Sequence, residues 1–344
     1  LTGPALSCRP PAILRCRVLH FTATMPSYLL RRLTALATTL LLASALVFIL
    51  LDWLPGNAAE LQLGPDADPE AVAQLAAQLG LEHSAWQRYQ DWLWGLLHGE
   101  LGESWAYASP VADLIAERLQ VTVPLALLAL LLTLLLALAT GLYAALHHGR
   151  MGDWGLMALT QLGLAVPSFW LAILLILLFA VRLQWVAAGG FPGWSAEAGG
   201  GLLPGLRALV LPALALALVQ AAILARIVRA AVLDVLGQDF VRTARAKGLS
   251  PRATLLRHVL RNALVPVLTI AGLQLANLLA GTIVVENVFN LPGLGRLIFQ
   301  AIANRDLIVV RNCVLLLCAL VLLINAGVDL ASAWADPRTR HRHA

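Results

Sequence analysis

Hydrophobic and polar positions along this chain alternate in long blocks rather than at the short spacing of a soluble fold. Apolar runs cover residues 33–51, 121–146, 156–181, 206–231, 263–285 and 313–334. A run of about 20 apolar residues is what one α-helix needs to cross the hydrocarbon core of a bilayer. The pattern therefore predicts an all-α polytopic membrane protein with six transmembrane helices.

The polar segments between these runs differ in charge. Residues 57–120 hold ten acidic and two basic residues, whereas residues 226–262 hold eight basic and two acidic residues. Lysine and arginine concentrate on the cytoplasmic side of membrane proteins, so the second segment is expected inside and the first outside. Six spans with both termini in the cytoplasm satisfy this distribution.

The outer segment is expected to contain amphipathic helices over residues 69–80 and 84–97. The second helix carries four aromatic residues at helical spacing, Trp86, Tyr89, Trp92 and Trp94. A small core or an interfacial belt is favoured over a ligand-binding surface, which stays the alternative.

Composition agrees with lipid as the solvent. The chain is 60% hydrophobic and 12% charged, which excludes an ordinary soluble domain. Its net charge of +5 is better explained by membrane orientation than by nucleic-acid binding. The four cysteines (Cys8, Cys16, Cys313 and Cys318) form no framework, and no disulfide or metal site is expected. His147 and His148 have no evident acidic partner and are interpreted as interfacial polar residues.

Residues 1–24 show no helical periodicity and contain three prolines. We expect a disordered or mis-assigned extension, with Met25 as the native start. A short cytoplasmic tail is the alternative.

The segment from Asp239 to Pro266 is strongly basic and has the pattern helix, turn, helix. Asp239 is expected to cap a short helix and Gly248 to end it in the left-handed conformation. Ser250 and Pro251 are typical of the start of the next helix. An isolated two-turn helix is marginal in water, and an apolar face rimmed by arginines suits a groove on another protein. A basic loop that only follows the charge rule is the alternative.

These residues resemble a known family. Arg242-Thr243-Ala244 followed by Gly248 is similar to the cytoplasmic "EAA" loop of ABC-importer permeases, and RTARAKGLSP with RHVLRNALVP resembles the dipeptide/oligopeptide/nickel branch. GELGES, PSFW, NVFNLPGLGRL and the closing DPR resemble further elements of that branch, so the resemblance covers residues 25–338. Arg242 stands where the motif has Glu, and Leu307-Ile308 stands where Tyr-Pro is frequent.

The resemblance implies a permease subunit in the bacterial inner membrane. Its first helix would be 25–52, its extracytoplasmic helical domain 53–120, its five-helix core 121–338 with a coupling loop at 234–262, and its tail 339–344. Implied partners are a homologous second permease, two ATPase subunits that bind ATP and Mg, and an extracytoplasmic substrate-binding protein. This chain itself would bind no cofactor. Dipeptides, oligopeptides, nickel chelates, glutathione and antimicrobial peptides all stay open as cargo.

Three sets of site residues follow from these interpretations. The ATPase-coupling set is Asp239, Phe240, Arg242, Thr243, Ala244, Arg245, Lys247 and Gly248, with Phe240 and Ala244 as apolar contacts. The translocation-path set is Gln220, Gln274, Asn277 and Asn325, for which plain interhelical hydrogen bonds are the alternative. The outer-gate set is Glu286, Pro292, Gly293, Gly295, Arg296 and Arg305, in which Glu286 is expected to pair with Arg296 or Arg305. A salt bridge that only seats the loop is the alternative, and Arg311 is expected to add a charge to the outer face.

Catalytic chemistry is missing from the pattern. A P-loop needs a lysine after a glycine-rich loop and before Ser or Thr, but the only lysine, Lys247, is followed by Gly248. The chain is therefore expected to be no enzyme. An ion-coupled secondary transporter would place carboxylates at mid-membrane, whereas Glu286 and Asp329 lie near span ends. That class and a passive channel are kept as alternatives.

Overall fold

The computed structural model describes residues 13–53, 59, 63–64, 67–78, 82–195 and 199–335. Within these ranges the chain is almost wholly helical, and five helices are long and apolar enough to cross a membrane. The number is six if the bent pair Met151–Ala165 and Ser168–Arg182 forms one span. The prediction of an all-α polytopic membrane protein is confirmed.

The long helices extend beyond the predicted spans. They are α1 (Ile13–Asp52), α5 (Val111–Leu146), α8 (Leu202–Leu236), α11 (Leu260–Val288) and α13 (Leu307–Ala335). The shorter helices are α3 (Pro69–Gln78), α4 (Ala85–His98), α6 (Met151–Ala165), α7 (Ser168–Leu175), α9 (Asp239–Ala246), α10 (Pro251–Thr254) and α12 (Leu294–Ala303). Two π-helical segments, Ile176–Arg182 and Leu255–Val259, and the antiparallel strands β1 (Glu103–Ser104) and β2 (Ser109–Pro110) complete the chain. Residues 13–24 were expected to lack regular structure, but they form the first part of α1; residues 1–12 lie outside the described ranges.

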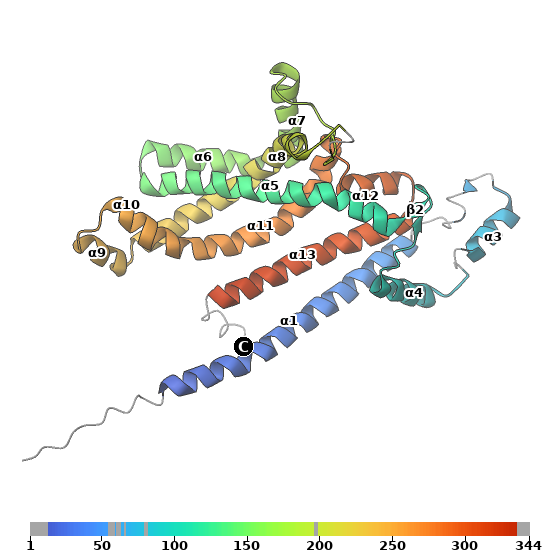
Figure 1. Cartoon of the computed structure of the whole chain (residues 1–344), viewed down its shortest axis with the longest axis horizontal. Coiled ribbons are helices and arrows are strands. Elements are labelled where there is room, and N and C mark those ends of the chain that lie inside the picture. Colours follow the sequence, from blue (N-terminus) through green and yellow to red (C-terminus); the bar gives the residue numbers. More distant parts are fainter. Residues whose placement is uncertain are drawn as a thin grey trace, which may run out of the picture.

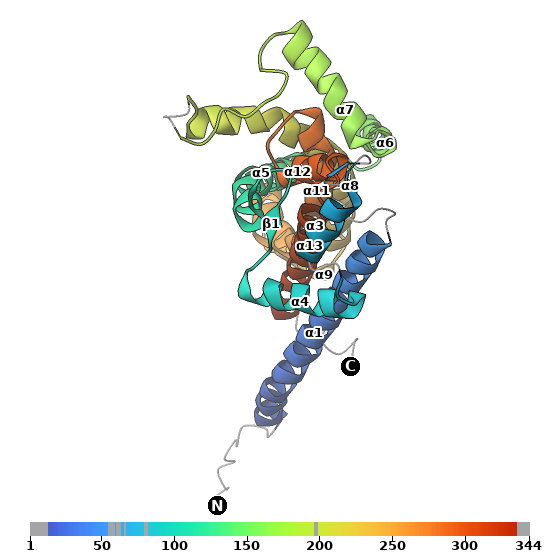
Figure 2. The same ribbon diagram turned by 90° about the vertical axis from the view of Figure 1, so that its right-hand side faces the viewer.

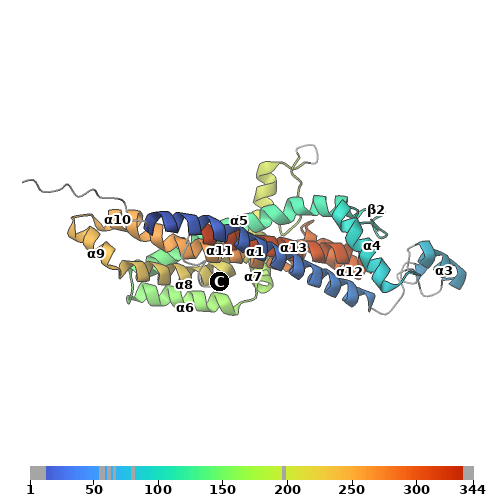
Figure 3. The same ribbon diagram turned by 90° about the horizontal axis from the view of Figure 1, so that it is seen from below.

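The two ends of the bundle carry different elements. Helices α9 and α10 lie at one end, and α3, α4 and the strands lie at the other (Figures 1 and 3). Arg32, near the start of the candidate span Leu30–Asp52, forms an ion pair with Asp329 near the end of α13. At the opposite end of α1, Asp52 pairs with Arg88 of α4 at 2.8 Å. Helices α1 and α13 lie side by side and run antiparallel (Figure 1).

The third apolar run, predicted as one helix over residues 156–181, is broken instead. Helices α6 and α7 meet at an angle of 103°, and Val166 between them is extended, with φ −93° and ψ 121°. The residue before a proline is driven out of the helical region, here by Pro167, which caps α7. Figure 2 shows α7 leaving the bundle, so the sequence element PSFW produces a corner rather than a gentle bend.

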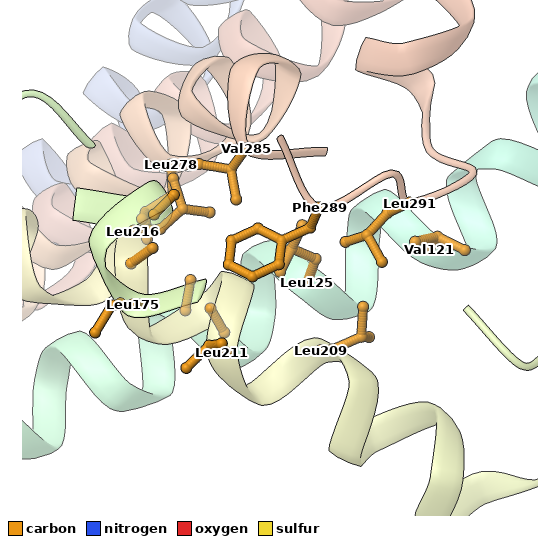
Figure 4. Packing of buried hydrophobic residues seen from close by; sticks show 14 residues of the cluster. Val121, Leu125, Leu175, Leu209, Leu211, Leu216, Leu278, Val285, Phe289 and Leu291 are labelled. Carbon is orange, nitrogen blue, oxygen red and sulfur yellow. The ribbon is translucent and has the colours of Figure 1, made fainter. Parts of the chain in front are cut away.

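Close helix contacts are made at small residues. A methyl group on Gly141 of α5 would lie 2.5 Å from the carbonyl oxygen of Ala225 in α8, and one on Gly272 of α11 would strike Val328 of α13. Such contacts replace hydrophobic burial as the source of packing energy in lipid. Towards the outer side, the ring of Phe289 fills the space between α5, α8 and α11 (Figure 4).

Helix α4 packs against α1 and α13 through part of its aromatic stripe, and the rest of the stripe is exposed. Its start is fixed by a reciprocal cap in which Ser84 and Gln87 bond each other's backbone. Trp92 is buried against Phe48 of α1 and donates to Asn312 Oδ1 at 3.0 Å. Trp86 and Trp94 are exposed, which leaves the interfacial-belt interpretation for them. Arg311 lies with its guanidinium over the Trp92 ring, 4.5 Å from the centroid, so its charge is packed against α4.

Candidate functional site

Helix α9 begins differently from the prediction. Its N-cap is Gln238, whose backbone is extended and whose side chain makes no capping bond. Asp239 is the first helical residue, and its side chain is almost fully exposed, 3.5 Å from Arg242. The expectation that Asp239 caps the helix is therefore wrong. Its carboxylate stabilises α9 in another way, because a negative charge is favourable near the positive end of the helix dipole.

The inner face of α9 is held by its own chain. Val241 is completely buried, and it joins a core cluster with Val235 of α8 and Val259 beyond α10. Ala244, one turn on, is also buried. The prediction that Ala244 contacts the ATPase is therefore wrong for this conformation. Burial of this face supplies the stability that a two-turn helix lacks alone.

The turn after α9 follows the sequence pattern. Gly248 has φ +86°, and its N–H donates to the carbonyl oxygen of Arg245 at 3.0 Å. Ser250 then caps α10 by accepting from the N–H of Ala253, and Pro251 occupies the first helical position. Both predictions for this turn are confirmed. Because α10 continues through the π-helical segment into α11, the loop is joined without a break to a membrane span.

The outer face of α9 is a cationic surface with one large apolar side chain. Arg242, Thr243, Arg245 and Lys247 are exposed, and Phe240 is 40% exposed. Within residues 239–250, all of which are described, the Asp239–Arg242 contact is the one ion pair. The unpaired charges and Phe240 can accept a partner that offers carboxylates around an apolar hollow.

The four translocation-path candidates do not lie together. Gln274 is buried and donates from Nε2 to the backbone oxygen of Gln220 at 3.2 Å. The side-chain oxygens of Gln220, Gln274 and Asn325 are buried without a hydrogen-bond partner among the described residues. Asn277 is exposed on another face of α11. A buried acceptor without a donor is costly, so water or cargo at these three oxygens is what would satisfy them.

Glu286 is the centre of the outer turn, but its partners are not arginines. Its side chain is fully buried, accepts from Thr122 Oγ1 at 2.7 Å through Oε1, and accepts from the N–H of Gly295 at 2.7 Å through Oε2. Thr122 Oγ1 in turn accepts from the N–H of Leu294 at 2.9 Å. The carboxylate thus meets the free N–H groups at the start of α12, where anions are stabilised.

The predicted ion pair of Glu286 with Arg296 or Arg305 is therefore wrong. Arg296 donates to the backbone oxygen of Asn290 at 2.9 Å, and Arg305 is exposed. A side chain at Gly293 would strike the Glu286 carboxylate, which explains the glycine at that position. The turn is packed like a core, and its role as a gate stays a prediction.

Sequence reasoning missed one buried cluster at the α9 end. Asp153 at the start of α6 accepts from Arg229 of α8 at 2.6 and 2.7 Å in a bidentate pair. His148 Nδ1 lies 3.1 Å from the same carboxylate, and the N–H of Gly149 donates to it at 3.0 Å. The view that His148 has no acidic partner is therefore wrong. An acid at the start of an apolar helix was the available signal, because a buried acid needs a partner.

No arrangement of catalytic type joins these groups. Within the described ranges, no cluster of three or more His, Cys, Asp or Glu side chains is placed to hold a metal ion. The site consists of an exposed cationic helix at one end and a buried carboxylate turn at the other. The exposed cationic helix can bind a partner that carries acidic groups.

Comparison with known proteins gives one family. Residues 137–341 match the family described as binding-protein-dependent transport system inner membrane component, and residues 25–126 match the N-terminal domain described for such components. A peptide transport system permease protein of Brucella abortus is 43% identical over 92% of this chain and 100% of its own length. A di/tripeptide transport system permease of Pseudomonas aeruginosa and a glutathione transport system permease of Escherichia coli are each 38% identical, again over 92% of this chain and 100% of their own length.

Proposed function

Because this chain belongs to the binding-protein-dependent transport system inner membrane component family, we propose that it carries peptides or small peptide derivatives such as glutathione. It is a multi-pass inner-membrane permease of an ABC importer, and ATP is hydrolysed on a separate subunit. The peptide and glutathione names of its relatives support this cargo class. Nickel chelates stay a prediction from the resemblance alone.

The coupling element in this proposal is α9 with the turn at Gly248. One observation carries it: a short helix has its apolar inner face packed against its own chain, while Phe240 and a cationic face, whose one ion pair is Asp239–Arg242, point outward. Arg242, Arg245 and Lys247 would meet carboxylates of the ATPase, and Phe240 would enter an apolar hollow. Charge pairs of this kind set orientation more than affinity.

Motion would pass from α9 into two spans. The helix follows α8 after two residues, Gly237 and Gln238, and it leads through α10 into α11. Closure of the ATPases on ATP would displace α9 as a rigid body and tilt both long helices between inward-open and outward-open states. The burial of Val241 against both neighbours makes such rigid coupling physically possible.

A second, homologous permease belongs to the proposal. Many large apolar side chains on the long helices are exposed in the isolated chain, for example Leu127, Leu131 and Leu135 along α5. Lipid or a second permease can cover them. The unsatisfied oxygens of Gln220, Gln274 and Asn325 would then border the shared cavity, and alanine at these positions should lower the transport rate at unchanged assembly.

The proposal is tested by reconstituting the permease with its second permease, ATPase and binding protein in vesicles. We expect uptake of a labelled dipeptide that requires ATP and the binding protein. Reversal of Arg242, Arg245 and Lys247 to glutamate should lower both uptake and ATPase copurification. The matched control reverses the same number of charges at Arg252, Arg257 and Arg261, which are exposed and basic but outside α9. Equal losses in the two variants would show that net charge alone matters and would refute α9 as the coupling element.

A further inference from the structure

A cationic cavity opens at the outer end of the molecule, between the start of α5 and α12. Its volume is about 290 Å³. Its polar lining comes from Tyr107, Arg118, Arg296 and Gln300, and Pro292, Gly293 and Leu297 complete the wall. The residues come from three separate segments, so the cavity exists only because α12 packs against the outer part of α5.

The two arginines in this cavity are only weakly paired: Arg118 has one long ion pair, and Arg296 has none among the described residues. The nearest acidic oxygen to Arg118 is Glu117 Oε1, 3.8 Å away on a side chain that is 66% exposed. The Arg118 side chain is only 19% exposed, and its Nε is buried without a hydrogen-bond partner. Arg296 makes one hydrogen bond, from Nη1 to the backbone oxygen of Asn290. Two guanidinium groups that face one cavity repel each other unless an anion lies between them.

The other polar groups also present donors. Tyr107 donates its O–H to Gln300 Oε1 at 3.1 Å, which leaves the Gln300 amide N–H groups free to donate. The nearby carboxylate of Glu286 is sealed beneath Gly293, where Thr122 and the N–H of Gly295 occupy it. The cavity therefore offers positive charge and hydrogen-bond donors from several directions.

We propose that this cavity binds a carboxylate group that arrives from the outer side, with Arg118 and Arg296 as its ionic partners and Gln300 as a donor. Guanidinium forks match carboxylates in geometry as well as charge. Pockets for small ligands start at about 300 Å³, so the cavity holds a carboxylate with one adjoining residue and not a whole peptide. The proposal rests on the proposed function, which supplies two sources: the terminal carboxylate of a peptide cargo, and an Asp or Glu side chain of the binding protein.

The first arm of the test uses a small probe on the complete complex in lipid nanodiscs. Phenylglyoxal labelling of Arg118, read by peptide mass spectrometry, should be slowed by dialanine and not by alanyl-alaninamide, which lacks the carboxylate. In the Arg296→Gln variant the dialanine concentration for half-protection should rise at least about tenfold, the loss expected for one charge-assisted hydrogen bond. Arg182→Gln, an exposed arginine outside the cavity, is the matched control and should change nothing. Equal protection by the acid and the amide would overturn the proposal.

The second arm identifies the source of the carboxylate with the double variant Arg118→Gln, Arg296→Gln. If the cargo supplies it, the KM for dipeptide uptake rises about tenfold while the affinity for the binding protein stays constant. If the binding protein supplies it, its Kd for the complex rises about tenfold. Unchanged values of both, in a variant that copurifies normally with the ATPase, would refute the carboxylate site. Failure of the wild-type complex to couple uptake to ATP would instead refute the proposed function.

Discussion

Replacement of Gly248 by valine should uncouple the permease from its ATPase without disturbing the spans. Gly248 has φ +86°, and a Cβ built on it would meet no atom within 4 Å. The energetic cost of valine at this position therefore comes from its backbone conformation and not from clashes with neighbouring atoms. A non-glycine residue in the left-handed region costs about 1–2 kcal/mol, and a β-branched one lies at the upper end. That energy lowers the population of the native turn by roughly 5- to 30-fold.

The assay compares variants of the reconstituted complex for membrane insertion, ATPase copurification and binding-protein-stimulated ATP hydrolysis. Gly248→Val should insert normally but lose most copurification. Gly248→Asn should retain most of it, because asparagine tolerates the left-handed region. Phe240→Ala should show a milder loss, since it removes the exposed apolar contact and keeps the turn.

A matched control is available on the other side of the membrane. Gly99 ends α4 with φ +80°, and a Cβ there would also meet nothing within 4 Å. Gly99→Val carries the same backbone strain but should leave coupling intact. Full coupling in Gly248→Val, or an equal loss in Gly99→Val, would refute the assignment of the 239–250 turn as the coupling element.

Three further predictions concern the rest of the chain. A cysteine at position 245 should be labelled only after cells are permeabilised, whereas one at position 91 should be labelled from outside; external labelling at 245 would invert the topology. Asp153→Asn should lower the free energy of unfolding by about 3 kcal/mol, because it breaks a buried bidentate pair whose arginine is only partly exposed. In thermal unfolding in detergent, the double variant Asp153→Asn, Arg229→Gln should lose less stability than the two single variants lose together. Glu286→Ala should lower the free energy of unfolding by about 1–3 kcal/mol, because it leaves the buried N–H of Gly295 unpaired, and Glu286→Gln should lower it less. Equal melting temperatures for Glu286→Ala and the wild type would contradict the buried network.

The sequence by itself determined the apolar helices and the turn after α9, while the sides of the membrane and the coupling role of that turn stay predictions. Apolar length and the placement of arginine are responses to lipid and to the two aqueous compartments, so they can be read without knowing the fold. The glycine at 248 and the Ser250-Pro251 pair act within one or two turns, and the structure places them as predicted. Such features depend on backbone geometry near the residue itself.

Only the tertiary structure decided the partners of the buried polar groups. Glu286 was expected beside an arginine near in sequence, yet its partners are the N-terminus of α12 and Thr122, more than 160 residues away. Asp153 was overlooked because Arg229 comes from a helix 76 residues on. Which face of α9 is buried was likewise set by α8 and by the segment after α10, so Val241 and Ala244 face inward. A buried charge takes whichever donors the packed helices bring to it, and the order of residues along the chain does not specify that arrangement.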